Sequence, residues 1–460
     1  MRKYTFILFT LLFCSNAATC LDTLYLVDFL TIIKENHPLI NKANLFDEFE
    51  EAYRLKGKGV LDPKLHSNYN RKRFDDTDYY TVWQSEAKIP TRLPIDFSVG
   101  YENNSGDFLA NDDSVPKNGL VYGTINLNIL RGLLFDEQRF QIQAAELNGI
   151  KSRIDKNLLL REIIYQAVGA YLDWSKAFYE VEIYRDYLDL VTVRHQNVVE
   201  LFRNGDSPAV DTIESIVNLN TAEKIFLESA ESLLSKQQKL NLFLWNEDGQ
   251  PLQISNQVIP SELENLLSYL EEISLIISPA FENDPSVRKF QNRINALELT
   301  NRLQKEQLKP NLVLKYNTIV SLGKDDFNPT FSLNDYKYGV SFEYPILNRK
   351  TKGDIRLNEA MIKQNLYDKT QYQETLANKY VEINARQIIQ QDILNIVNQK
   401  INNSEVLYAA ENLKFQLGES SIFLLNSRER KLLEARTDLI KSFSSIGKLY
   451  NERYYLKLGQ

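Results

Sequence analysis

The chain is an internal duplication, and four prolines reveal it. Pro38 corresponds to Pro285 and Pro63 to Pro310, each pair being 247 positions apart. Neighbouring residues follow the same offset, since Leu65 and Tyr69-Asn70 correspond to Leu312 and Tyr316-Asn317. A repeat must be recognised first, because its two copies are expected to form the same elements. We therefore predict that each half carries a helix, a strand-like segment and then a very long helical tract.

The first twenty residues are typical of a secretory signal. Arg2-Lys3 precede an apolar run from Ile7 to Phe13, and small residues follow at Ala17-Ala18. The run is too short to cross a bilayer as a helix, and a buried N-terminal strand is the alternative. Cys14 and Cys20 are the only cysteines, so the mature chain is expected to lack disulfides and thiolate metal sites. Lipidation of Cys20 stays open.

Charge and hydropathy narrow the possible partners. The net charge of −7 argues against nucleic acid. No later stretch contains 18 or more consecutive apolar residues, so the sequence predicts no transmembrane helix. If this exported chain spans a membrane, it must do so as a β-barrel, the other closed structure that lipid permits.

Alternating residues predict strands at about 63–73 and 119–131 in the first half, and 310–322 and 336–347 in the second. The alternation is clearest where Tyr338, Val340, Phe342 and Tyr344 alternate with Gly339, Ser341 and Glu343. This pattern fits a half-exposed soluble sheet or a barrel with a watery lumen. The first half is also thirty residues longer, since Ile129 precedes its counterpart Ile346 by 217 positions rather than 247. We interpret residues 74–116 as an inserted hairpin.

Long helices are predicted at about 132–203, 209–245, 350–416 and 422–457. Residues spaced alternately four and three apart form a heptad seam in the first of them: Ile163, Ala167, Ala170, Trp174, Ala177, Val181, Tyr184, Leu188, Val191, His195, Val198 and Phe202. A helix of roughly 70 residues would be about 100 Å long. Shorter helices are expected at Leu24 to Asn36 and Asn41 to Gly57, and residues 246–280 connect the two repeats, 21–245 and 281–460.

Several motifs recur in order in both halves. They are the helix end Asn36-His37-Pro38-Leu39, the strand ends Ile129-Leu130-Arg131-Gly132-Leu133 and Tyr344-Pro345-Ile346-Leu347, and the helix turns Phe202-Arg203-Asn204-Gly205 and Phe415-Gln416-Leu417-Gly418. Together, behind a signal peptide, they resemble the TolC-like outer-membrane efflux and secretion proteins over almost the whole mature chain.

The resemblance implies a mainly α fold with a transmembrane β-barrel part and two structural repeats. A homotrimer would form one conduit, each protomer giving four strands to a shared barrel and four coiled-coil strands to a helical barrel. The implied place is the outer membrane of a Gram-negative-type cell, with a periplasmic helical extension. The implied function is a passive exit duct that works with a periplasmic adaptor protein and an inner-membrane transporter.

The resemblance also assigns candidate site residues. Those at the periplasmic entrance, where an adaptor would dock, are Gly205, Asp206, Ser207, Asp211, Gly418, Glu419, Ser420 and Ser421. Those facing outer-membrane lipid are Tyr338, Val340, Phe342 and Tyr344. The chain departs from the family twice. The inserted hairpin either adds barrel strands or forms a flap. Asp211 in the first turn aligns with Leu424 in the second, so the two repeats do not supply equivalent acidic residues for a gate, and the second turn offers Glu419 instead.

No enzyme chemistry is predicted. We find no His/Cys/carboxylate cluster with metal spacing and no phosphate-binding loop, so no catalytic, metal or cofactor site is expected. His37 is read as part of a helix end and His66 as a strand position. His195 in the seam is either a hydrogen-bonded packing residue or a lumen pH sensor. The competing function is a non-channel periplasmic or surface coiled-coil structural protein.

Overall fold

The computed structural model describes residues 22–109, 114–255, 257–276, 280–321, 332 and 334–458. The predicted signal peptide, residues 1–20, lies outside them, and so does Cys20. The chain divides into two compact units, each built from three separate segments. We call them the helical unit (Met1–Ile40, Ile163–Leu275 and Ile383–Tyr455) and the sheet unit (Asn41–Glu162, Ile276–Glu382 and Leu456–Gln460).

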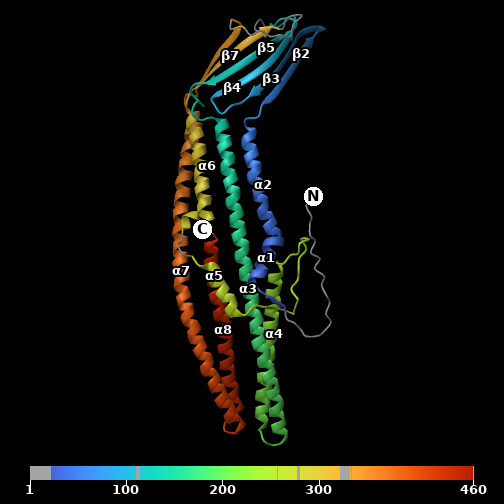
Figure 1. Ribbon diagram of the computed structural model, residues 1–460, viewed down its shortest axis with the longest axis vertical. Helices are drawn as coiled ribbons and strands as arrows, with labels where there is room; N and C mark the ends of the chain where they lie inside the picture. The colour runs from blue at the N-terminus through green and yellow to red at the C-terminus, as the bar shows by residue number, and fades with distance from the viewer. Residues whose placement is uncertain are drawn as a thin grey trace, which may run out of the picture. The chain divides into compact units, whose positions relative to one another are not determined.

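Long helices dominate the helical unit (Figure 1). It contains α1 (Leu26–Asn36), α4 (Ala209–Asn241), α5 (Leu263–Ser274), most of α8 (Ile422–Lys457) and the C-terminal parts of α3 (Glu137–Arg203) and α7 (Arg349–Gln416). Most of the seam predicted for α3 is buried, since Ile163, Ala167, Trp174, Val181 and Val191 are all at most 3% exposed, but its last member, Phe202, is exposed. The predicted heptad periodicity therefore corresponds to helix packing, as in coiled coils.

The connection between the repeats, residues 246–280, contains a helix and a short strand that were not predicted from the sequence. Besides α5, it contains β6 (Val258–Pro260), which pairs in parallel with β1 (Asp22–Leu24). Tyr171 of α3 fixes this small sheet, because its hydroxyl donates to the Leu24 carbonyl oxygen at 2.6 Å and lies 3.2 Å from Ser261 Oγ. Three-residue strands carry too little alternation to be detected from sequence.

The sheet unit combines helices with one antiparallel sheet. Its other elements are α2 (Pro38–Gly59, mostly in this unit), β2 (Lys64–Phe74), β3 (Thr77–Ile89), β4 (Ile95–Ser105), β5 (Leu120–Asn128), η2 (Phe281–Asn283), α6 (Pro285–Gln307), β7 (Asn311–Ser321), β8 (Tyr336–Glu343) and the N-terminal parts of α3 and α7. The predicted fold class, mainly helical with antiparallel strands, is confirmed. None of the described helices is long and apolar enough to cross a bilayer.

The sheet has more strands than the family resemblance implies. Its order is β2-β3-β4-β5-β7-β8, with every neighbouring pair antiparallel. The expectation of four strands per protomer is wrong for this chain, because the inserted segment forms β3 and β4. These strands pair between β2 and β5, so they belong to the sheet and do not form a flap.

The duplicated prolines mark equivalent helix starts. Pro38 and Pro285 are the first residues of α2 and α6, where a missing N–H and a fixed φ are tolerated. The residue before each proline accepts a hydrogen bond from the second helical N–H. His37 Nδ1 accepts from Leu39 N at 3.1 Å, and Asp284 Oδ1 accepts from Ser286 N at 2.8 Å. Different side chains thus fill the same capping role in the two repeats.

We expect His37 to make the stability of the helical unit depend on pH. Its ring is buried, its Nε2 lies 3.3 Å from the Leu242 carbonyl oxygen, and burial lowers its pKa below the ordinary 6.5, opposed in part by that hydrogen bond. The unfolded chain binds the proton more readily, so stability must fall as pH drops below about 6.5 through the lowered folded pKa. We expect the His37→Asn variant to lose part of this dependence in denaturant titrations between pH 7 and 5. An identical slope in both proteins would contradict the assignment.

Candidate functional site

One face of the sheet is apolar across all six strands. Paired residues point to the same face, and the register joins Tyr338 to Tyr316, Val340 to Leu314 and Phe342 to Leu312. Following the register across the other strands assigns thirteen exposed apolar residues to this apolar face: Leu65, Tyr69, Trp83, Ile89, Phe97, Val99, Ile125, Leu314, Tyr316, Tyr336, Tyr338, Val340 and Phe342. Such a continuous exposed apolar surface marks a contact with membrane or protein.

The opposite face is polar, and we call it the polar face. The register gathers there Lys64, His66, Asn68, Gln84, Glu86, Lys88, Asp96, Glu102, Thr124, Asn126, Asn317, Lys337 and Glu343. Neighbouring strands are linked on this face, for example by Lys88 Nζ and Asp96 Oδ2 at 3.3 Å. Tyr122 lies across Gly100, where a Cβ atom would come within 2.2 Å of Tyr122 Cζ, so a larger residue at position 100 would require the ring to move.

The structure places three of the four predicted lipid-facing residues together. Tyr338, Val340 and Phe342 share the apolar face of β8, whereas Tyr344 follows the last residue of the strand and is also exposed. Burial alone does not separate the faces of β8, since all its residues are exposed. β8 and β2 are the two edges of the sheet, and within the described part of the chain each pairs with one neighbour. Unpaired edges with two exposed faces are expected to associate further.

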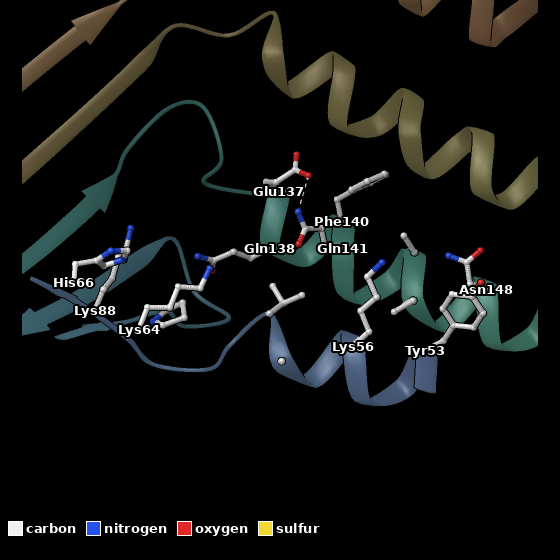
Figure 2. Close-up of a pocket in the computed structure, with 15 residues that line it drawn as sticks. Tyr53, Lys56, Lys64, His66, Lys88, Glu137, Gln138, Phe140, Gln141 and Asn148 are labelled. Atoms are coloured by element: carbon white, nitrogen blue, oxygen red, sulfur yellow. Dashed lines mark hydrogen bonds between the residues drawn. The ribbon is translucent and has the colours of Figure 1, made fainter. Parts of the chain in front are cut away.

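A cavity of about 830 Å³ opens where the polar face meets the helices (Figure 2). Lys64 of β2 and Lys88 of β3 are direct cross-strand partners there, with His66 nearby and Lys56 contributed by α2. The one carboxylate among its described lining residues, Glu137, accepts a hydrogen bond from Gln141 Nε2 at 3.1 Å. The cavity is therefore basic and water-accessible.

The two predicted helix turns have the same backbone structure. In the first, Gly205 has a φ of +83°, and the amides of Gly205 and Asp206 donate to Phe202 O and Leu201 O. The second repeats this with Gly418, whose φ is +73°, and with Glu419 N donating to Lys414 O at 2.8 Å. Both are Schellman motifs, which require a left-handed residue and thus explain each glycine.

The remaining predicted turn residues lie in or beside these motifs. Ser207 Oγ donates to Asp211 Oδ2 at 2.9 Å, and Ser420 Oγ donates to Glu411 of the preceding helix. Asp206, Glu419 and Ser421 are exposed. Both turns lie at the same end of α3, α4, α7 and α8 within the helical unit (Figure 1). Exposed apolar residues accompany them: Phe202, Val210, Ile213, Leu417, Phe423 and Leu424.

A buried polar network joins the helices near the turns, and its only trace in the sequence is a set of polar residues within apolar seams. Arg194 of α3 forms a bidentate ion pair with Glu429 of α8, one arm measuring 3.0 Å. Burial alone would lower the pKa of Arg194, but hydrogen bonding to Glu429 and its charge leave the pKa raised. Asn426 of α8 links the pair onward, accepting from Arg194 at 3.2 Å and from Asn218 of α4 at 3.4 Å.

His195 lies beside this network and has a packing role. It is half-buried in the α3 seam, and its Nδ1 lies 2.8 Å from Ser215 Oγ of α4. Of the two alternatives for His195, this contact favours the hydrogen-bonded packing residue over the pH sensor. Among the described residues, no group of three or more histidine, cysteine or carboxylate side chains has a geometry that would hold a metal ion.

The outer helices of the helical unit expose apolar stripes. Side-chain contacts link α7 to α8 through Lys400 and Asp438, α8 to α3 through Glu429 and Arg194, and α3 to α4 through Tyr187 and Asn218. The stripes on α4 and α7 share one spacing: Val210, Val217, Leu227 and Leu234, then Ile389, Ile396, Val406 and Leu413. Exposed stripes at heptad-like intervals are suited to packing against another helix.

Comparison with known proteins connects these features to one fold. No protein-family model and no curated protein matches the sequence. The structure is similar to the outer membrane protein VceC from Vibrio cholerae, at 13% identity and a TM-score of 0.64, over 94% of this chain and 96% of that one. It is also similar to the CmeC outer membrane channel of Campylobacter jejuni, at 12% identity and a TM-score of 0.67, over 94% and 85%.

A third similar structure is the open state of the MtrE outer membrane channel of Neisseria gonorrhoeae, at 12% identity and a TM-score of 0.63, over 94% and 88%. At such low identity the likeness concerns the fold. All three structures are of outer-membrane proteins, two of them channels by description, and none is described as an enzyme. The resemblance read from the duplicated motifs is thereby confirmed: this chain has the fold of TolC-like outer-membrane channels.

Proposed function

We propose that this protein is the outer-membrane exit duct of a multicomponent efflux or secretion system. The observation that carries the proposal is the sheet with one exposed apolar face and one polar face. A sheet of this kind suits lipid on one side and a water-filled lumen on the other. The fold shared with outer-membrane channels supports the same reading. A coiled-coil spacer would leave the apolar face without a role.

Assembly into a homotrimer follows from the unpaired surfaces. Six strands with open edges at β2 and β8 do not close a barrel, and lipid does not tolerate open edges. β2 and β8 run in opposite directions, because five antiparallel steps separate them, so β8 of one copy can pair with β2 of the next in an antiparallel ladder. The stripes on α4 and α7 offer matching contacts between copies. The repeats 21–245 and 281–460, joined by 246–280, would each supply one part of the conduit.

Assembly can be tested in detergent. We expect the extracted protein to sediment as about three protomers in analytical ultracentrifugation, because the two open sheet edges require association and the family resemblance implies three copies. Arginine placed at both Val217 and Ile396, on the α4 and α7 stripes, is expected to shift the protein toward smaller species. A stable, folded monomer of the unaltered protein would contradict the proposal.

We further propose that the two glycine-centred turns form the periplasmic entrance, where an adaptor protein docks and an inner-membrane transporter delivers cargo. Their common Schellman geometry and exposed apolar residues are consistent with docking of helical hairpins. The acidic residues Asp206, Asp211 and Glu419 would lie around this entrance. Passive export through the duct needs no catalytic group.

Closing the entrance should stop export. In a background free of other cysteines, we expect Ser207→Cys with Ser420→Cys to crosslink within or between copies and to block export, since the turns would no longer separate. Reduction should restore transport in the same cells, which controls for misfolding. Normal export by fully crosslinked protein would show that the turns do not gate the pathway.

A further inference from the structure

The inserted hairpin, β3 and β4, is an integral part of the six-stranded sheet. The second repeat contributes two strands, β7 and β8, whereas the first contributes four, because β3 and β4 lie between β2 and β5. β3 pairs with β2 from Lys88↔Lys64 to Thr77↔Phe74, and it pairs with β4 from Ile89↔Phe97 to Thr81↔Ser105. β4 in turn pairs with β5 over eight positions. Both inserted strands therefore have ladders on both sides.

The side chains of the hairpin continue both faces of the sheet. Trp83, Phe97 and Val99 extend the apolar face and are exposed. Glu86, Asp96 and Glu102 lie on the polar face, where Gln84 Nε2 donates to Glu102 Oε2 at 3.4 Å. An inserted segment that preserves the alternation on both faces has the pattern of a membrane-wall strand pair.

We propose that this hairpin widens the outer-membrane mouth of the duct and so sets the size of cargo that leaves it. The inference rests on the proposed function. In a closed barrel the diameter grows roughly linearly with strand number. Six strands per copy instead of four therefore give a mouth about 1.5 times as wide and about twice as large in area, whatever the number of copies.

The cargo class follows from the width. Three copies with six strands each would make an eighteen-stranded wall, which is in the range that encloses an aqueous channel. The mouth would pass solutes too bulky for a twelve-stranded wall. The hairpin also supplies most of the carboxylates on the polar face, since it contributes Glu86, Asp96 and Glu102, whereas the other four described strands contribute Glu343 alone. Lysines balance them, and Lys88 of the hairpin pairs with Asp96.

A deletion tests the width directly. Removing residues 77–105 leaves β2 joined to β5 by a loop, the antiparallel arrangement that β7 and β8 already adopt in the second repeat. Both proteins are inserted in planar bilayers, and neutral polymers of increasing size are added on the side of the β2–β3, β4–β5 and β7–β8 connections only. We expect the exclusion radius of the mouth to fall by about one third in the deletion variant. Equal radii would overturn the inference.

A second measurement protects the test if the deletion variant does not fold. Electron microscopy of the unaltered oligomer should show six wall strands per copy, whereas four per copy, with the hairpin outside the wall, would overturn the inference. The outcomes also separate this inference from the proposed function. If the unaltered protein and the deletion variant both conduct and have the same exclusion radius, only the role of the hairpin is contradicted. An unaltered oligomer that forms no wall around a lumen contradicts the duct itself.

Discussion

Replacing Asp284 with alanine is expected to lower the free energy of unfolding by about 3–5 kcal/mol, the range found when one partner of a buried ion pair is removed. Asp284 and Arg161 form such a pair, with side chains only 2% and 1% exposed. The alanine would leave the Arg161 guanidinium buried without its carboxylate. It would also remove the cap on α6, because Asp284 Oδ1 accepts from Ser286 N.

The structure offers a matched control for this prediction. Asp155 pairs with Lys289 at 2.9 Å, also between α3 and α6, but those side chains are 23% and 52% exposed. Asp155→Ala should therefore change the free energy of unfolding by no more than about 1 kcal/mol. Denaturant titration of the purified variants measures both. Similar losses of unfolding free energy in the two variants would mean that burial does not increase the contribution of the Arg161–Asp284 pair to stability.

The second large effect concerns the two faces of β8. Phe342→Arg places a charge on the apolar face and is expected to reduce assembled protein in the outer membrane, since arginine facing lipid near the midplane costs roughly 2–4 kcal/mol. Glu343→Arg changes the adjacent residue on the polar face, so it should assemble and alter conductance or cargo preference. Folded oligomer in membrane fractions is the quantity to compare. Equal tolerance of both substitutions would show that β8 does not face lipid in this register.

The elements predicted best from the sequence are those whose residue pattern repeats many times along the chain. The α3 seam extends over many turns, so its buried residues could be identified from spacing alone. The glycine-centred turns were equally clear, because Gly205 and Gly418 end long helices and recur in both repeats. The caps that precede Pro38 and Pro285 could not be recognised as equivalent from sequence. One is a histidine and the other an aspartate, and they have in common only a side-chain atom that accepts a hydrogen bond.

What sequence could not predict depends on long-range pairing. Residues 74–116 showed strand character, but which strands β3 and β4 join is decided by partners distant in the chain, and the pattern fits a flap as well as a wall. The ion pair of Arg194 with Glu429 joins residues 235 positions apart. A single sequence contains no signal for such a contact beyond a charged residue in an apolar seam. The candidate lipid-facing residues could be predicted because alternation along one strand is a local pattern. That the apolar face continues across all six strands could be seen only from the pairing register between strands.

Aqueous labelling of the two sheet faces in intact outer membranes tests the central claim most directly. Single cysteines are placed at Ser341 and Asn126 on the polar face, and at Val340 and Ile125 on the apolar face, in a background free of other cysteines. A charged, membrane-impermeant maleimide should label the first pair through the water-filled lumen and leave the second pair unmodified in lipid. Equal labelling of both faces would contradict the account, because it would mean that this sheet lies in water and forms no part of an outer-membrane duct.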